Sequence, residues 1–364
     1  MNKYYLMLIA LFFCMIMSCS RSPVKPERDE VTIIEDITED TVWESGKDFL
    51  VVGRVAIDVG VRLYIEGDVT ISFKNKNSIL EIYGFLIGNG RQENMNICFK
   101  VAEEQETDRM QKALNAFEGA EIKLNYCKFD AFLVAVKSYG SRLEINNSSF
   151  ENCNRAIYSI RADTCVISDS NFRNNNNDVV FEQALHKNVK NYEIVDCNFT
   201  NAKLAGVMLT NNCFATVRNN LFTACCQGIL IEHHSNSVIT QNSFLNCETG
   251  LFFSYQYGVN SEVTMNMFEN SDCSIGLFLS WPTVTNNNFS GNTGLNISSM
   301  HNPSVLVNAK NNWWGSIVEE DIKRSIYDKN SPNATDNSGL VEYVPFLTSA
   351  LKDAGAIKSE NIVD

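Results

Sequence analysis

The residues of this 364-residue chain whose types suit catalysis are two carboxylates, two cations and a histidine: Glu182, Glu232, Arg161, Lys187 and His233. Hydrolysis of a glycosidic bond needs two carboxylates, and the repeat register separates Glu182 from Glu232 by two coils, about 9.6 Å. That separation is near the upper limit for an inverting hydrolase. A uronate lyase needs a base and a cation, which His233 with Arg161 or Lys187 could supply. The chain has no Asp-Asp pair and no acidic cluster suited to calcium, so catalysis stays an alternative.

A second set of residues suits binding rather than catalysis: Tyr158, Phe252, Tyr255, Phe278 and Trp281. Alignment of the coils on a recurrent glycine places Tyr158, Phe252 and Phe278 in one outward column. It places Tyr255 and Trp281 in another. Aromatic faces stack on pyranose rings, and a contiguous exposed apolar strip marks an interaction site. The sequence leaves two alternatives open: a loop or the C-terminal tail covers this strip, or the alignment is off by one residue.

Metal ions and nucleic acids are not expected as partners. No cysteines or histidines have the spacing of a zinc site. His233 and His234 are adjacent, so on a strand their rings would point to opposite faces. The net charge is −13 and no basic run follows the N-terminal segment, which argues against nucleic acid. We therefore predict no metal, no cofactor and no nucleic-acid partner.

A phenylalanine recurs about every 22 residues through the middle of the chain, at intervals of 21 to 27. The recurring residues are Phe129, Phe150, Phe172, Phe199, Phe222, Phe244, Phe268 and Phe289, with Trp313 following. The Phe usually lies in one frame: Asn-x-Phe or Asn-Phe, then Cys or Asn, then Gly or Ala before an aliphatic residue. A period of this length with β-type composition predicts a single-stranded right-handed parallel β-helix. We expect inward Phe columns, side-chain ladders of Asn, and glycines with positive φ at the corners.

The N-terminal segment has the features of a lipoprotein signal. Lys3 precedes an apolar run of about a dozen residues, which is too short to span a membrane. The run ends before Cys19, the residue that would carry the lipid. Residues 1–18 are the predicted signal peptide, and residues 19–30 are a polar tether. The expected location is the bacterial cell envelope, at the outer membrane, with contact to the membrane through the lipid alone.

The rest of the chain divides into three predicted parts. Residues 31–118 contain the first coils and a charged excursion from Ala102 to Glu118, residues 119–315 contain the regular coils, and residues 316–364 form a cap and tail. Most of the cysteines fall on repeat positions, where a free thiol packs as a small hydrophobe. Disulfides between neighbouring coils, such as Cys225 with Cys247, are the alternative.

The C-terminal part resembles the end of secreted right-handed parallel β-helix repeat proteins. The matching residues are Asn311-Asn312-Trp313-Trp314-Gly315, Ile322, Ile326-x-Asp328 and Gly339-x-Val341-x-Tyr343-x-Pro345-Phe346-Leu347. This broad, pectate-lyase-like family includes polysaccharide lyases, hydrolases and a periplasmic group that serves the maturation of a copper enzyme. The resemblance implies the fold and leaves the activity open.

These observations predict an envelope-anchored β-helix lipoprotein that binds polysaccharide, or a cell-surface glycan, along one face without catalysis. A polysaccharide lyase or glycoside hydrolase that uses the same face is the first alternative. A structural or adhesive surface protein is the second.

Overall fold

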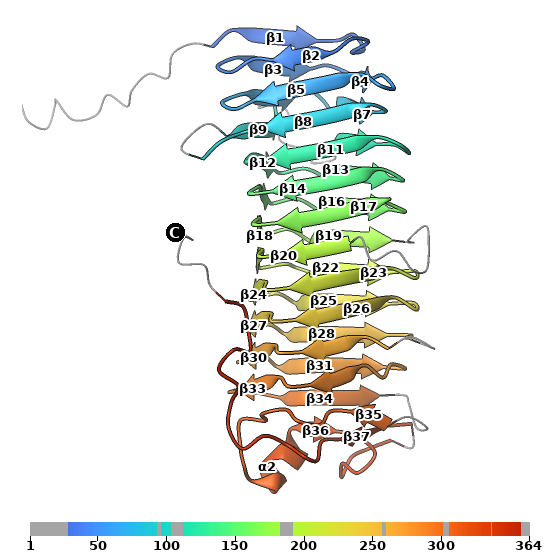
Figure 1. Cartoon of the computed structure of the whole chain (residues 1–364), viewed down its shortest axis with the longest axis vertical. Coiled ribbons are helices and arrows are strands. Elements are labelled where there is room, and N and C mark those ends of the chain that lie inside the picture. Colours follow the sequence, from blue (N-terminus) through green and yellow to red (C-terminus); the bar gives the residue numbers. More distant parts are fainter. Residues whose placement is uncertain are drawn as a thin grey trace, which may run out of the picture.

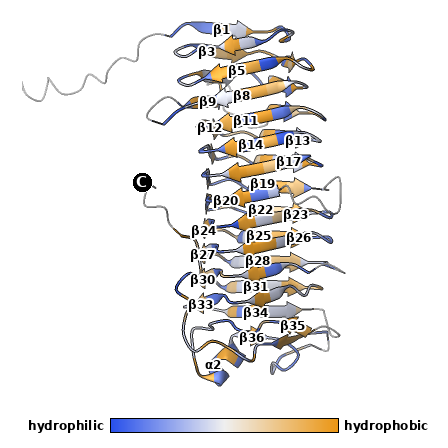
Figure 2. Cartoon of the chain, viewed as in Figure 1, coloured by the Kyte–Doolittle hydropathy of each residue, from blue (hydrophilic) through white to orange (hydrophobic). Residues whose placement is uncertain are grey.

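The strands of this chain stack into one elongated solenoid (Figure 1). The computed structural model describes residues 28–92, 96–102, 112–182, 192–256, 260–300, 306–335 and 337–357. Within these ranges, every long sheet consists of parallel strands, and each coil gives one strand to each of three sheets. The predicted single-stranded right-handed parallel β-helix is confirmed. Hydrophobic residues are concentrated in the strands, where they alternate with hydrophilic ones, and the turns are mostly hydrophilic (Figure 2).

The first sheet carries the recurrent phenylalanines on short strands. Its strands, in stacking order, are β1 (Glu30–Ile33), β3 (Asp48–Val51), β6 (Thr70–Phe73), β9 (Ile97–Val101), β12 (Cys127–Asp130), β15 (Ser149–Glu151), β18 (Asn171–Arg173), β21 (Asn198–Thr200), β24 (Leu221–Thr223), β27 (Ser243–Leu245), β30 (Met267–Glu269) and β33 (Asn288–Ser290).

The second sheet has the longest strands and carries the predicted site. Its strands are β4 (Arg54–Ile57), β7 (Ile79–Ile82), β10 (Lys112–Ala116), β13 (Val134–Tyr139), β16 (Arg155–Ile160), β19 (Asn177–Glu182), β22 (Ala205–Thr210), β25 (Gln227–Glu232), β28 (Thr249–Ser254), β31 (Cys273–Phe278), β34 (Leu295–Met300) and β36 (Ile326–Tyr327). Strand β10 lies inside the predicted excursion, so that prediction is wrong for residues 112–116. Residues 103–111 lie outside the described ranges.

The third sheet closes each coil. Its strands are β2 (Thr41–Trp43), β5 (Arg62–Glu66), β8 (Phe85–Asn89), β11 (Glu121–Asn125), β14 (Arg142–Asn146), β17 (Thr164–Ser168), β20 (Tyr192–Val195), β23 (Phe214–Arg218), β26 (Asn236–Thr240), β29 (Glu262–Thr264) and β32 (Thr283–Thr285). A separate pair, β35 (Leu306–Asn308) and β37 (Leu340–Glu342), lies near the C-terminal end.

The recurrent phenylalanines form one continuous stack in the core, as predicted. Neighbouring rings from Phe99 to Phe289 lie nearly parallel, with centroids 4.3 to 5.2 Å apart. The stack ends on Trp314, whose centroid is 5.0 Å from that of Phe289. The prediction that Trp313 continues this column is wrong by one residue, because Trp313 pairs with Asn288.

The recurrent glycines have a different role from the predicted one. Gly206, Gly228 and Gly250 are not among the residues with positive φ. A Cβ on Gly228 would lie 2.6 Å from a ring carbon of Phe244 and 2.6 Å from the carbonyl oxygen of Gly250. The glycine therefore makes room for the phenylalanine of the next coil. Positive φ is concentrated at other corners, where asparagines such as Asn219 (φ 55°) and Asn246 (φ 54°) tolerate it.

A buried asparagine ladder supports the later coils. It consists of Asn220, Asn242, Asn266, Asn287 and Asn312, all fully buried. The Oδ1 of Asn266 accepts hydrogen bonds from the backbone N–H (2.9 Å) and the side-chain Nδ2 (3.0 Å) of Asn242. Its own Nδ2 donates to the backbone carbonyls of Ile239 and Thr264. The predicted ladder is confirmed, and it satisfies turn groups that water cannot reach.

The described cysteines are all free thiols, so the alternative of disulfides is not realised. Most of them are buried at repeat positions. Burial raises the pKa of the Cys153 and Cys197 thiols to about 12. These residues therefore pack as small hydrophobes, as expected for most of them.

The C-terminal segment caps the solenoid and then turns back along it (Figure 1). Helix α2 (Glu319–Arg324) follows the last coil and buries Ile322. The tail then follows the first sheet, where Leu351 exchanges two hydrogen bonds with Asn288, and Ala356 donates to Ser243 Oγ. The alternative that the tail covers the strip named Tyr343, Phe346 and Leu347. Tyr343 instead packs edge-on against Trp314, and the Leu347 N–H donates to the Asn312 carbonyl, so these residues lie at the cap. Among the described residues, no helix is long and apolar enough to cross a membrane.

Replacement of Asn266 by Ala should lower the free energy of unfolding by about 3 kcal/mol or more, because several buried polar groups lose their partners at about 1–3 kcal/mol each. The measurement is urea denaturation followed by circular dichroism. Exposed Asn171 supplies the matched control, since Asn171→Ala should cost less than about 0.5 kcal/mol. Equal midpoints for the two variants would contradict the assigned role of the ladder.

Candidate functional site

The register of the second sheet defines the outward column that carries the predicted strip. From coil to coil this column runs through Lys137, Tyr158, Val180, Met208, Leu230, Phe252 and Gly276. Leu251 pairs with Ile275 and Ile275 with Ile297, so the predicted alignment on Gly276 and Gly294 is wrong by two residues. Gly276 instead faces outward beneath the Phe252 ring, where a Cβ would lie 2.6 Å from Cδ2 of Phe252.

Three rings form an aromatic cluster at the C-terminal edge of this face: His233, Tyr255 and Phe278. The rings of His233 and Tyr255 stack with centroids 5.7 Å apart, and Phe278 meets Tyr255 edge-on at 5.1 Å. Tyr255 is 40% exposed. Phe252 is half-buried on β28, two residues before Ser254, the register partner of Phe278. Of the five predicted binding residues, the structure thus brings Phe252, Tyr255 and Phe278 to one area.

The other two predicted binding residues lie apart from this cluster. Tyr158 is four coils away, on β16. Trp281 follows the end of β31 and packs against the buried core. It therefore does not share the column of Tyr255, contrary to the prediction. Trp281 was misplaced because the coils were aligned on Gly276, which is two residues out of register.

The corner after the second sheet holds its side chains in a strained backbone conformation. Arg161, His233 and Tyr255 all have positive φ, at 51°, 50° and 55°. Such φ values are rare for residues with bulky side chains, and they persist where the surrounding structure enforces them. Here the corner backbone is fixed by inter-coil hydrogen bonds, such as His233 N–H to the Ser254 carbonyl at 3.1 Å. His233 and Tyr255 are therefore held one coil apart, and Arg161 lies at the same corner three coils before His233.

Tyr158 is engaged on two sides. Its hydroxyl donates a short hydrogen bond to the carboxylate of Glu182, one coil further on. The guanidinium of Arg155 lies over its ring, 4.6 Å from the centroid. Burial, followed by the hydrogen bond to Glu182, raises the pKa of Tyr158 to about 12. Tyr158 thus stays a neutral phenol and fixes Glu182 in place.

The catalytic candidates lie on the same edge without forming an acid–base pair across a cleft. Glu182 pairs with Thr210, and Glu232 lies one coil beyond, as predicted from the register. His233 Nδ1 lies 4.0 Å from a Glu232 oxygen and 3.4 Å from the Thr210 hydroxyl. Arg161 donates to the Tyr139 hydroxyl at 3.3 Å. Lys187 lies outside the described residues.

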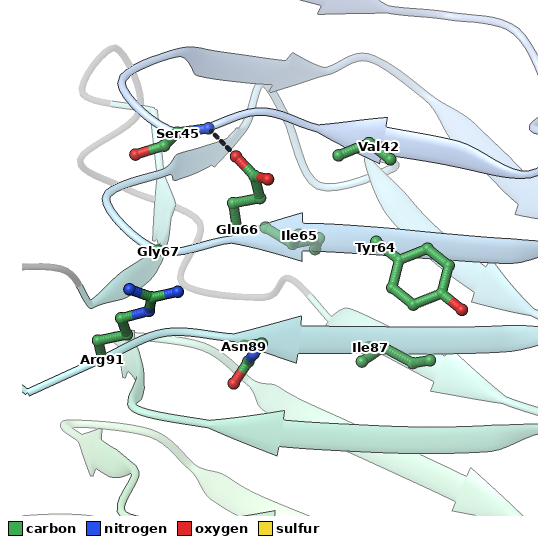
Figure 3. A pocket seen from close by; sticks show the side chains of 9 residues that line it. All are labelled: Val42, Ser45, Tyr64, Ile65, Glu66, Gly67, Ile87, Asn89 and Arg91. Atoms are coloured by element: carbon green, nitrogen blue, oxygen red, sulfur yellow. Dashed lines mark hydrogen bonds between the residues drawn. The ribbon is translucent and has the colours of Figure 1, made fainter.

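The third sheet carries a hollow that the sequence reasoning missed (Figure 3). Two adjoining depressions of about 410 and 590 Å³ share Ile87 and Asn89. The first contains Tyr64 and Arg91, together with Glu66, which accepts a hydrogen bond from the Ser45 N–H at 2.9 Å. The signal was the alternation of exposed and buried residues in Arg62–Glu66, which turns Tyr64 outward.

A carboxyl group lies fully buried beneath the second sheet. Asp178 occupies the position filled by Gly206 in the next coil, beside the core. Its Oδ1 accepts a hydrogen bond from Asn175 Nδ2 at 2.7 Å, and its Oδ2 has no partner among the described residues. Burial raises the pKa of Asp178 well above its usual range. The side chain is completely buried, so its ionisation acts on stability.

The fold and the aromatic cluster on the second sheet define a parallel β-helix protein with an aromatic edge. The chain belongs to the family described as periplasmic copper-binding protein (NosD), whose profile matches residues 115–316, more than half of the chain. The family is periplasmic, which places the chain in the cell envelope. Comparison with curated proteins and with solved structures gives no match.

The family description raises the question of whether these residues fit a copper ion. In the described ranges, no three His, Cys, Asp or Glu side chains gather as a metal-ligand group. The thiol of Cys153 is buried and its raised pKa disfavours the thiolate that would bind copper. The described residues therefore do not fit a copper centre with three or more such ligands, and no step of the function is derived through copper.

Replacement of Asp178 by Asn should raise the free energy of unfolding at pH 7 by at least about 1 kcal/mol. The folded pKa is raised, so the native state of the parent protein loses stability as pH rises from about 4 through that folded pKa. The variant lacks this loss. The measurement is urea denaturation between pH 4 and 8. Asp130→Asn, at an exposed position, is the control and should leave the pH dependence unchanged. Parallel pH profiles for parent and Asp178→Asn would refute the assignment.

Proposed function

We propose that this envelope protein binds polysaccharide along the outer face of the second sheet, without catalysis. The observation that carries the proposal is the aromatic cluster of His233, Tyr255 and Phe278 with the neighbouring Phe252. Stacked aromatic faces with polar groups beside them suit pyranose rings, which present apolar faces and hydroxyl edges. The apolar column from Val180 to Phe252 continues this face, with Met208 and Phe252 partly exposed and Val180 and Leu230 buried.

The shape of the face also supports an extended ligand. Equivalent side chains recur about every 4.8 Å along the stack, so the same contact repeats in a straight line. The polar positions beside the aromatic rings are Thr210, Glu232 and Ser254, which lie in successive coils of one column. Their hydroxyl and carboxylate groups suit hydrogen bonds to sugar hydroxyls. A polymer with a regular repeat can engage such a ladder better than a compact ligand can.

Non-catalytic binding is favoured over hydrolysis by the state of the carboxylates. Glu182 accepts the hydrogen bond of Tyr158 and lies 3.5 Å from Asn211 Nδ2, so its oxygens are already engaged. Glu232 lies two coils away on the same flat face, whereas the two carboxylates of a glycosidase flank the bond from opposite sides. A lyase that uses Arg161 and His233, and a structural or adhesive surface protein, remain the alternatives tested below.

We also propose that Cys19 carries the lipid that anchors the chain, with residues 20–30 as the tether. The support is the sequence of residues 1–18, which lies outside the described residues. A diacylglycerol plus a further acyl chain provides stable membrane attachment. The first described strand begins at Glu30, directly after this polar segment.

The double replacement Tyr255→Ala/Phe278→Ala should weaken polysaccharide binding by about tenfold or more, since each ring contributes roughly 1 kcal/mol of stacking. The measurement is isothermal titration of soluble protein, residues 20–364, against a panel of neutral and acidic polysaccharides. Tyr64→Ala, in the hollow of the third sheet, is the matched control and should bind as the parent does.

The outcomes of this titration separate the functions. Unchanged affinity in the double variant, or loss of affinity in Tyr64→Ala alone, would place the site elsewhere. Appearance of ultraviolet absorbance from unsaturated uronate products would make the protein a lyase. Absence of binding to every polysaccharide would favour the structural or adhesive alternative.

Replacement of Cys19 by Ser should release the protein from the membrane fraction and abolish incorporation of radiolabelled palmitate. Cys14→Ser, within the apolar run, is the control and should leave both unchanged. The measurement is metabolic labelling with fractionation of the cells. Continued labelling of the Cys19→Ser variant would disprove the anchor.

A further inference from the structure

The N-terminal half of the same face carries a cluster of three cations: Lys112, Lys137 and Arg155. Lys112 pairs with Val134 and Val134 with Arg155, so Lys112 and Arg155 share an outward column, two coils apart. Lys137 lies on the coil between them, in the column that continues through Tyr158 to Phe252. The basic cluster and the aromatic cluster thus occupy one face of the second sheet.

This basic cluster is unusual in a chain with a net charge of −13. Most arginines of the other coils pair with a carboxylate: Arg62 with Asp40, Arg142 with Asp163, Arg173 with Glu151 and Arg218 with Glu193. Within the described ranges, Lys112, Lys137 and Arg155 have no such ion pair. Three cations lie close together here, although acidic residues outnumber basic ones in the chain as a whole.

The lowered pKa of Lys137 indicates that the basic cluster lacks a neighbouring negative charge. Its side chain is half-buried. Burial, and then the positive charges of Lys112 and Arg155, lower the pKa of Lys137. Like charges at close range destabilise one another, and an anion placed among them relieves both the repulsion and the desolvation. In the part of the chain that the structure describes, no carboxylate forms an ion pair with these three cations.

Two carboxylates of the same face, Glu182 and Glu81, are engaged by other groups. Glu182 accepts the Tyr158 hydroxyl, and Tyr158 in turn lies beneath the guanidinium of Arg155. Glu81, in the same outward column towards the N-terminus, forms an ion pair with Arg54. Neither carboxylate forms an ion pair with the basic cluster. The positive charge of the basic cluster therefore favours binding of an external anion.

We infer that Lys112, Lys137 and Arg155 bind the anionic groups of an acidic polysaccharide whose sugar rings continue along the face to the aromatic cluster. This inference rests on the proposed function and names its ligand class. Arg155 can bind a carboxylate or sulfate through two N–H groups, while the two lysines act as point charges. The coils of Arg155 and Phe252 are four apart, about 19 Å along the stack, so only an oligosaccharide of several residues spans both clusters.

The test is the triple variant Lys112→Gln/Lys137→Gln/Arg155→Gln, titrated with three probes. Polygalacturonate oligomers carry carboxylates, the same oligomers reduced at the carboxyl group are neutral, and dextran sulfate carries sulfates. The parent should bind at least one anionic probe more tightly than the reduced oligomers, with an affinity that falls as salt shortens the screening length. The triple variant should lose about tenfold or more of that affinity and keep its affinity for the reduced oligomers.

Two controls keep the result interpretable. Lys128→Gln removes an exposed cation from the first sheet and should change nothing. Arg155→Lys retains the charge and should restore part of the binding lost by Arg155→Gln, which a merely structural role would not do. Circular dichroism and the midpoint of thermal unfolding establish that each variant is folded.

Each outcome decides between the two proposals. Binding of the neutral oligomers with no preference for the anionic probes overturns the inference and leaves the proposed function standing. Equal binding of anionic probes by the parent and the triple variant overturns it as well. Binding of vesicles of phosphatidylglycerol with no binding of any glycan would assign the cations to a lipid surface and overturn both.

Discussion

The stacking of one coil on the next, through backbone hydrogen bonds in a fixed register, is the constraint on which the rest of this structure depends. Each inward position must then accept the same kind of side chain in successive coils, because it lies directly above its equivalent. The Phe stack from Phe99 to Phe289 and the ladder from Asn220 to Asn312 are two results of that constraint. The glycine at position 228 is a third result, because the ring of Phe244 occupies the space that a Cβ would need.

The inward columns could be predicted from the sequence because stacking requires the same residue types to recur once in each coil. Phe, Asn and Cys recur in one frame, and a single shared frame suffices to identify the fold, the Phe core and the ladder. The prediction failed where the residues of the repeat are shifted along the sequence although the pairing of the strands is unchanged. In β31 the glycine moves to an outward position under Phe252, so an alignment on glycines misplaces Phe278 and Trp281 by two residues. After Phe289 the cap changes the spacing, and Trp314 replaces the expected Trp313.

Outward positions are not subject to the same constraint, and this is why the candidate site was only partly predictable. Tyr64 in the third-sheet hollow belongs to a coil without the Phe frame. Lys112 follows a segment that breaks the period, so its approach to Arg155 emerges only from the strand register. Glu182 and Glu232 fall in one column, as expected, because the strands keep their register across the longer interval from Phe172 to Phe199. Sequence periodicity thus predicts the columns, while neighbours across a broken period require the structure.

The freedom of the outward positions also explains how a family with one fold can diverge in function. The core fixes the spacing of every outward side chain at about 4.8 Å along the stack, whatever its type. A change of function then requires only a change of the outward residues, since the stacking of the core is unaffected. In this chain the outward face of the second sheet passes from cations at Lys137 and Arg155 to apolar residues at Met208 and Phe252. Such a gradient along a rigid, evenly spaced surface suits a ligand that is itself long, repetitive and charged over part of its length.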